Sequence, residues 1–66
     1  MKNSIRVQRA IKNITQAELA QLVNVSRQTI NTMESGKYIP STVLALKIAA
    51  IFEVSVEQVF ELEEGD

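Results

Sequence analysis

The apolar residues of this chain recur mostly at spacings of three and four, the pattern of one helix face. The clearest case is the range 44–52, where positions 44, 45, 48, 49 and 52 share a face. Near the start, Val7 and Ile11 are four residues apart and predict an opening helix over residues 5–12. The hydrophobic pattern therefore indicates helices at both ends of the chain.

Capping residues mark where the other helices begin. Thr15 and Glu18 have the spacing of a capping box, and Ser55 and Gln58 repeat it. Ser26 is a third residue of the kind that caps a helix N-terminus. Together with the apolar pattern, these caps predict about five short helices joined by very short connections.

The chain is expected to form one small all-α domain over residues 1–66. Strand-like alternation occurs only at residues 59–62, which predict at most a two-stranded ribbon with residues 1–3. A domain of this length buries only about 60% of its unfolded surface, so its core is small. Such domains usually depend on a staple, a metal or a partner chain.

Cysteine and histidine are both missing, and their absence narrows the range of possible chemistry. The chain has no cysteine, which excludes disulfides and thiolate metal sites. It has no histidine, the commonest zinc ligand and the usual general base. Its carboxylates gather near the C-terminal end instead of pairing for acid–base work. We expect no metal, no cofactor and no enzymatic activity.

The chain is expected to be a soluble cytoplasmic protein. Its first ten residues, MKNSIRVQRA, lack the apolar run of a secretory signal. The apolar stretch VLALKIAAIF contains Lys47 and is far too short to span a bilayer.

The net charge of −1 hides a strong asymmetry. Residues 1–52 contain seven basic residues and two acidic ones, for a charge of +5. Residues 53–66 contain six acidic residues and no basic one, for a charge of −6. A basic body with an acidic end is typical of polyanion binding, although a solvated surface with a solubilising end gives the same totals.

Residues 16–35 have the organisation of a helix-turn-helix. Asn24 falls where the chain must turn sharply between two helices, and asparagine tolerates a positive φ. Such a motif joins its helices by three or four residues, although any small helical hairpin shares this spacing. Taking 100° per residue from Ile30, the second helix turns short amides and hydroxyls away from the core. These residues are Gln28, Asn31, Thr32 and Ser35, with Arg27 and Thr29 beside them.

This outward face has the chemistry of DNA reading. A surface helix selected for helix propensity would favour Glu, Lys and Ala, whereas amides and hydroxyls weaken it. Glutamine can pair with adenine, arginine with guanine, and threonine can touch the thymine methyl group. An ordinary solvated polar face is the alternative.

Four short motifs carry a resemblance to a known family. T-Q-x-E-L-A, S-R-Q-T-I, M-E-x-G-K and L-x-I-A occur here in order. Over about residues 4–60, the chain resembles the Cro/CI-type helix-turn-helix family of phage and bacterial repressors, also called xenobiotic-response-element-like. The resemblance implies a five-helix bundle of the lambda-repressor-like type. It also implies a regulator, most simply a repressor, that binds double-stranded DNA at a palindromic operator as a homodimer.

The resemblance assigns roles to individual residues. It implies that Gln28 reads a base, together with positions that vary among members: Arg27, Thr29, Asn31 and Thr32. It implies that Gln16 donates to a phosphate and that Lys37 approaches the opposite phosphates. Weaker phosphate candidates are Tyr38, Ser41, Arg6 and Lys12.

Two further expectations concern stability and assembly. Arg9 occupies the family position of an arginine that pairs with a glutamate, here Glu34, about 40° from Ile30 on the inner side of its helix. We expect a partly buried Arg9–Glu34 pair that fixes the angle of the reading helix. A second apolar stripe predicts a dimer interface, with surface scatter as the alternative; its residues are Val43, Ala50, Ile51, Val54 and Leu62.

One alternative function stays open on the sequence. The same scaffold could serve as a protein-interaction module, such as an antitoxin or an adaptor, whose acidic residues 53–66 contact a basic partner.

Overall fold

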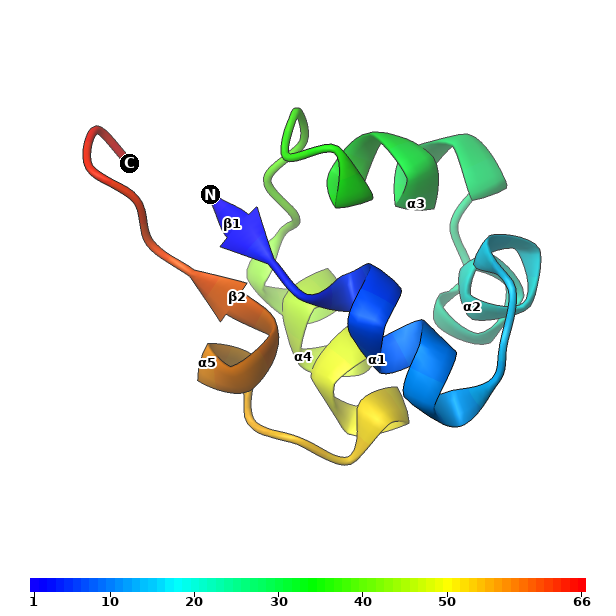
Figure 1. The fold of residues 1–66 in the computed structure, drawn as a ribbon. Helices are drawn as coiled ribbons and strands as arrows, with labels where there is room; N and C mark the ends of the chain where they lie inside the picture. Colours follow the sequence, from blue (N-terminus) through cyan, green and yellow to red (C-terminus); the bar gives the residue numbers. More distant parts are fainter.

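Five helices and one two-stranded ribbon make up the computed structural model, which describes residues 1–66 (Figure 1). The bundle of five helices and the short ribbon agree with the predicted fold class. In chain order the elements are β1 (Lys2–Asn3), α1 (Ile5–Lys12), α2 (Gln16–Val23), α3 (Arg27–Glu34), α4 (Thr42–Phe52), α5 (Val56–Val59) and β2 (Phe60–Glu61).

The predicted caps begin α2, α3 and α5. The Thr15 hydroxyl accepts a hydrogen bond from the Glu18 backbone N–H at 3.0 Å, and the Glu18 carboxylate accepts one from the Thr15 N–H at 2.9 Å. The second capping box is present at the start of α5, and the Ser26 hydroxyl accepts from the backbone of the first turn of α3. Each cap satisfies backbone donors that have no partner inside the helix.

Three helices end on a residue other than glycine in the left-handed conformation. Asn13, Asn24 and Glu53 have φ values of 57°, 61° and 58°. Asparagine tolerates this region, which confirms the prediction for Asn24, whereas glutamate pays a steric cost there. Gly36, just beyond α3, has a φ of 82°.

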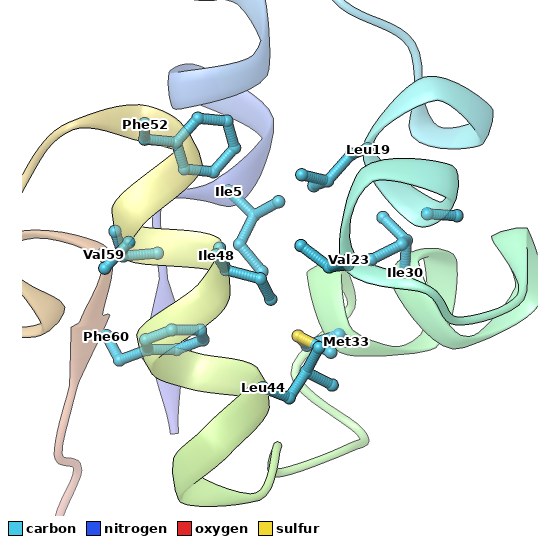
Figure 2. Close-up of a cluster of buried hydrophobic side chains, with 12 residues drawn as sticks. Ile5, Leu19, Val23, Ile30, Met33, Leu44, Ile48, Phe52, Val59 and Phe60 are labelled. Atoms are coloured by element: carbon cyan, nitrogen blue, oxygen red, sulfur yellow. The ribbon is translucent and has the colours of Figure 1, made fainter.

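The core lies where α4 faces α2 and α3, with Ile5 of α1 between them (Figure 2). The twelve residues that are buried as a whole are all apolar, and each of the five helices and β2 contributes at least one. The core residues are Ile5, Leu19, Ala20, Val23, Ile30, Met33, Leu44, Ile48, Ala49, Phe52, Val59 and Phe60.

The apolar pair of the opening helix does not join this core. Val7 and Ile11 are exposed, whereas Ile5 is fully buried. Arg9 lies one helical turn after Ile5 and so shares its inward face, where its side chain reaches α3. The expected helix is therefore correct in its bounds, but its inward face is Ile5 with Arg9 and not Val7 with Ile11.

The ribbon joins the two ends of the described chain. β1 and β2 are antiparallel, with Lys2 opposite Glu61 and Asn3 opposite Phe60. The ribbon is shorter than the alternation predicted, because Val59 still belongs to α5. The Asn3 amide donates to the Met33 carbonyl oxygen at 2.8 Å, which ties β1 to the end of α3.

Candidate nucleic-acid interface

α2 and α3 form a helix-turn-helix whose second helix lies at the edge of the molecule. Residues 24–26 connect them, with Asn24 in the left-handed conformation and Ser26 as the cap of α3. α3 buries Ile30 and Met33 completely and turns its other side outward. In Figure 1 it runs along the top of the molecule, and no other element covers its upper side.

The outward side of α3 carries the predicted base-reading residues. Arg27, Gln28 and Asn31 are exposed, while Thr29 and Thr32 are half-buried. The Thr32 hydroxyl donates to the Gln28 carbonyl oxygen at 2.9 Å and accepts from the Gln28 side-chain amide at 3.3 Å. Since these bonds use one amide hydrogen of Gln28, its second N–H and its side-chain oxygen remain available to a ligand.

Beneath α3, Arg9 and Glu34 form a two-point ion pair. The Arg9 Nε and one Nη lie 2.6 Å and 3.1 Å from the two carboxylate oxygens of Glu34. The Glu34 side chain is only 1% exposed and that of Arg9 is 16% exposed. Arg9 also donates to the Ile14 carbonyl oxygen at 3.1 Å. This pair ties α1, and the residues that precede α2, to the inner side of α3.

The environment of Glu34 keeps its carboxylate ionised. Burial alone raises the pKa of Glu34, but hydrogen bonds from Arg9 and Gln16, with the charges of Arg9 and Arg6, outweigh it. The pKa of Glu34 therefore lies below its ordinary value. The hydrogen bond to Glu34 raises the pKa of Arg9, despite some desolvation. A fully ionised pair gives α3 a fixed anchor.

Gln16, at the start of α2, contacts α3 in two places. Its side-chain nitrogen lies 3.1 Å from a Glu34 carboxylate oxygen and 3.3 Å from the Asn31 side-chain oxygen. The sequence predicts a phosphate donor at this position and gives no sign of the hydrogen bonds to Glu34 and Asn31. No local pattern could reveal them, because the bonded residues are 15 and 18 positions apart along the chain.

The other phosphate candidates lie in different places. Lys37 and Tyr38 are exposed just after α3, and the Ser41 hydroxyl caps α4. The Arg6 guanidinium is exposed near Glu34, at 3.6 Å. The Lys12 ammonium, on the last residue of α1, lies 3.2 Å from the carboxylate of Glu53, just after α4. In Figure 1 the C-terminal ends of α1 and α4 lie at the bottom of the molecule, away from α3. The structure thus brings Arg6, Lys37 and Tyr38 near the C-terminal end of α3, whereas Lys12 pairs with Glu53 after α4.

A surface hollow of about 450 Å³ lies beside the start of α2. Arg27 lines it from α3, and Arg9 lines it from α1. The remaining lining residues are Ala10, Asn13, Ile14, Thr15, Gln16 and Ala17. Because Glu34 already pairs with Arg9, the positive charge at this hollow comes from Arg27 and from the N-terminus of α2.

A second exposed surface, on the other side of α4, is apolar. Val43 is 62% and Leu62 is 77% exposed, and two unforeseen residues, Ile39 and Leu46, are also largely exposed. Of the predicted interface residues, Ala50 is exposed, whereas Ile51 and Val54 are half-buried against the protein's own core. We call the set Ile39, Val43, Leu46 and Leu62 the apolar face.

A groove of about 290 Å³ adjoins the apolar face. Leu46, Ile39 and Phe60 of β2 line it, and the exposed Leu62 follows Phe60 by two residues. Its other lining residues are Met1, Pro40, Thr42, Ala45 and Val56. The groove and a protruding leucine thus occur near each other on one side of the molecule.

Comparison with known proteins matches these features to a family. A helix-turn-helix family model matches residues 5–59, which include all five helices. The chain belongs to the Cro/CI-type helix-turn-helix family. The match confirms the resemblance drawn from the four motifs.

Several proteins of similar length match this chain over nearly all of its residues. An HTH-type transcriptional regulator of Methanocaldococcus jannaschii is 48% identical over 66 residues, covering 100% of both chains. The regulator YgzD of Bacillus subtilis is 45% identical over 64 residues, covering 97% of each chain. A regulator of Archaeoglobus fulgidus is 47% identical and covers all of this chain and 93% of its own.

Membership of this family makes the chain a DNA-binding transcriptional regulator. None of its helices is both long and apolar enough to cross a bilayer.

Proposed function

We propose that this regulator is a repressor that reads a palindromic operator as a homodimer, with α3 in the major groove. The outward side of α3 is the observation that carries the proposal. It presents Arg27, Gln28 and Asn31 to solvent, and no acidic residue lies among them. An α-helix fits the major groove, and these side chains can bond to guanine and adenine edges.

Basic side chains near the ends of α3 supply the phosphate contacts. Lys37 follows α3 and forms no ion pair within the protein, and the largely exposed Arg6 lies near the last turn of α3. Contacts of this kind fix the position of the protein on DNA without selecting a sequence. The affinity should therefore fall steeply as salt is added.

The size of one domain and the apolar face support the proposed dimer. The domain is 31 Å in its longest dimension, whereas two half-sites on one side of the duplex lie about 34 Å apart. One copy cannot place a reading helix in both. The apolar face takes its residues from α4, the segment before it and the segment after β2, and none from α3. Two copies can therefore join through it with α3 left free in each.

The proposed interface is self-complementary. In a twofold dimer, Leu62 of each copy contacts the groove of the other, and Val43 and Leu46 pack around it. Val43, Leu46 and Ala50 share one face of α4 by their spacing. Ile51 and Val54 contribute less than the sequence suggested, since their own core already covers part of them.

Selection from a random duplex pool tests this function directly. The full chain is incubated with duplexes that contain 30 random base pairs, and the bound sequences are recovered and read. We expect enrichment of a palindrome whose half-sites are centred about one helical turn apart. Binding without any enriched sequence, or enrichment of a single unrepeated half-site, would contradict the proposal.

The same protein and DNA separate the other readings. An adaptor or antitoxin that acts only on proteins would bind no duplex even at low salt. To test the sign of regulation, the selected operator is placed across the start site of a reporter promoter in vitro. A repressor lowers the transcript yield in proportion to occupancy, whereas an activator raises it.

A further inference from the structure

The structure assigns to Gln16 a positioning role: it orients the Asn31 amide so that the NH₂ group of Asn31, and not its oxygen, is turned toward a base. Asn31 then selects keto bases, guanine or thymine, over amino bases at the position that it contacts. This inference rests on the proposed function, in which α3 enters the major groove. It extends that function by naming a residue that sets specificity without reading DNA itself.

The protonation state of Glu34 determines which end of the Gln16 amide faces it. Its side chain is 1% exposed and held by Arg9, with Nε at 2.6 Å, so it is an ionised carboxylate. An ionised carboxylate can only accept hydrogen bonds. The end of the Gln16 amide that lies 3.1 Å from it must therefore be the NH₂ group.

The orientation of the Gln16 amide in turn determines that of the Asn31 amide. The NH₂ group of Gln16 also lies 3.3 Å from the Asn31 side chain. A donor there requires the Asn31 oxygen to face Gln16, so the Asn31 NH₂ group points away from it. Both bonds start from the Gln16 NH₂ group, which donates inward to the Glu34 carboxylate and outward to the Asn31 oxygen.

Two consequences follow for DNA contact. The Asn31 NH₂ group has no partner within the protein and is exposed on the outward side of α3. Gln16, with its NH₂ group engaged by Glu34 and Asn31, keeps its carbonyl oxygen free, and that oxygen cannot donate to a phosphate. We therefore assign Gln16 to the orientation of Asn31 in place of the expected phosphate contact.

The major groove distinguishes bases by the group that meets such a donor. Guanine and thymine present a carbonyl oxygen, whereas adenine and cytosine present an amino group at the corresponding place. An asparagine that rotates freely can satisfy adenine with both ends of its amide. An asparagine whose oxygen is already bonded favours guanine or thymine.

The test compares base preferences among variants on selected DNA. Wild type, Gln16→Met, Asn31→Ala and the control Gln28→Ala are each titrated against the selected operator and its single-base variants. Gln16→Met keeps the length and bulk of the side chain, and Gln16→Ala serves as a second variant. Thermal melting of each variant verifies that it is folded before binding is measured.

The position read by Asn31 is the one whose preference disappears in Asn31→Ala. There, wild type should prefer keto over amino bases by roughly tenfold, the size of one good base contact. Gln16→Met should reduce that ratio to about threefold or less and leave the other positions unchanged. Gln28→Ala should alter a different position.

Three outcomes would overturn the inference. In the first, Gln16→Met weakens binding to every sequence equally and leaves the preference for keto over amino bases unchanged, which is the result expected from the loss of a phosphate contact. Asn31→Ala could leave every position unaltered, or wild type could prefer an amino base at the position of Asn31. If wild type enriches no sequence at all, the proposed function fails instead.

Amide hydrogen exchange in the free protein then tests the geometry by itself. On ¹⁵N-labelled protein, the Gln16 side-chain NH₂ should exchange more slowly than the Asn31 side-chain NH₂. The Asn31→Ala substitution should speed the exchange of Gln16. Equal rates for Gln16 and Asn31 in wild type would contradict the assigned orientation.

Discussion

α3 and α4 both leave one side uncovered, and the two exposed sides differ in chemistry. On α3 the exposed side carries an arginine and two amides, Arg27, Gln28 and Asn31. On α4 it carries Val43 and Leu46, next to an apolar groove. A side that meets the hydrated edges of a duplex needs hydrogen-bonding groups, whereas a side that meets another copy gains free energy by losing water.

The two helices also differ in how they are anchored. α4 rests on purely apolar contacts through Leu44, Ile48 and Phe52. α3 rests on apolar contacts and on the Arg9–Glu34 pair, whose two-point geometry specifies direction as well as proximity. The difference indicates that the angle of α3 depends on a directional ion pair, because apolar contacts alone do not specify direction.

The largest expected effect comes from breaking that anchor. Glu34→Gln leaves the Arg9 guanidinium half-buried without a counter-charge, which should cost about 3–5 kcal/mol of unfolding free energy. Urea titration followed by circular dichroism measures the loss, with the exposed Glu64→Gln as control, expected within about 0.5 kcal/mol. The double variant Arg9→Met/Glu34→Leu should recover much of the stability. If the Glu34→Gln protein is as stable as wild type, the Arg9–Glu34 pair does not anchor α3.

Acid should weaken the same anchor with a defined sign. The folded pKa of Glu34 is lower than its ordinary value of 4.5, so the unfolded chain binds the proton first. Stability from this group is therefore complete above pH 4.5 and declines as the pH falls toward the folded pKa. Urea titrations between pH 7 and pH 3 should show a steeper decline for wild type than for Glu34→Gln. Parallel curves would mean that Glu34 titrates normally.

The next effect concerns the apolar face. Leu46→Glu places a charge where the second copy should bury a leucine, and should weaken the dimer by about 2 kcal/mol or more. Light scattering over a dilution series measures the dissociation constant. Leu22→Glu is the matched control, because Leu22 is also exposed but lies on α2, outside the apolar face. Equal effects of the two variants, or a monomeric wild type at tens of micromolar, would leave the face without this role.

A smaller effect separates phosphate contact from base reading on the α3 side. Lys37→Ala should weaken binding to all sequences alike and reduce the slope of log K against log salt by about 1. Lys12→Ala is the control, because Lys12 pairs with Glu53 at the opposite end of the molecule. Competition titrations with selected and scrambled duplexes at three salt concentrations measure both quantities. A loss confined to the selected duplex would place Lys37 among the base-reading residues.

The sequence predicted most of the fold because the helix boundaries are local. Thr15 with Glu18, and Ser55 with Gln58, mark two helix starts by spacing alone, and Asn24 marks a turn. Exposure of the α3 face also followed from the 100° repeat. These features depend on residues within one or two turns of each other, so a pattern along the chain contains them.

What the sequence could not predict depends on contacts between distant residues. Val7 and Ile11 have the spacing of a buried pair, yet both are exposed. The contact of Arg9 with Glu34, 25 residues away, is expected only from the resemblance to the family and not from any spacing along the chain. The bond between Gln16 and Asn31 crosses the helix-turn-helix, and the groove beside Leu46 is assembled from both ends of the chain. No window along the sequence includes both partners.

The central claim is that the outward side of α3 selects the DNA sequence. The most direct test is the ratio of affinities for the selected operator and a scrambled duplex, measured at one salt concentration for wild type and for Arg27→Ala/Gln28→Ala. We predict that the double variant remains folded and still binds scrambled DNA. The ratio of its affinity for the operator to its affinity for scrambled DNA should be at least tenfold lower than in wild type. An unchanged ratio in a folded double variant would contradict the account, because another surface would then read the sequence.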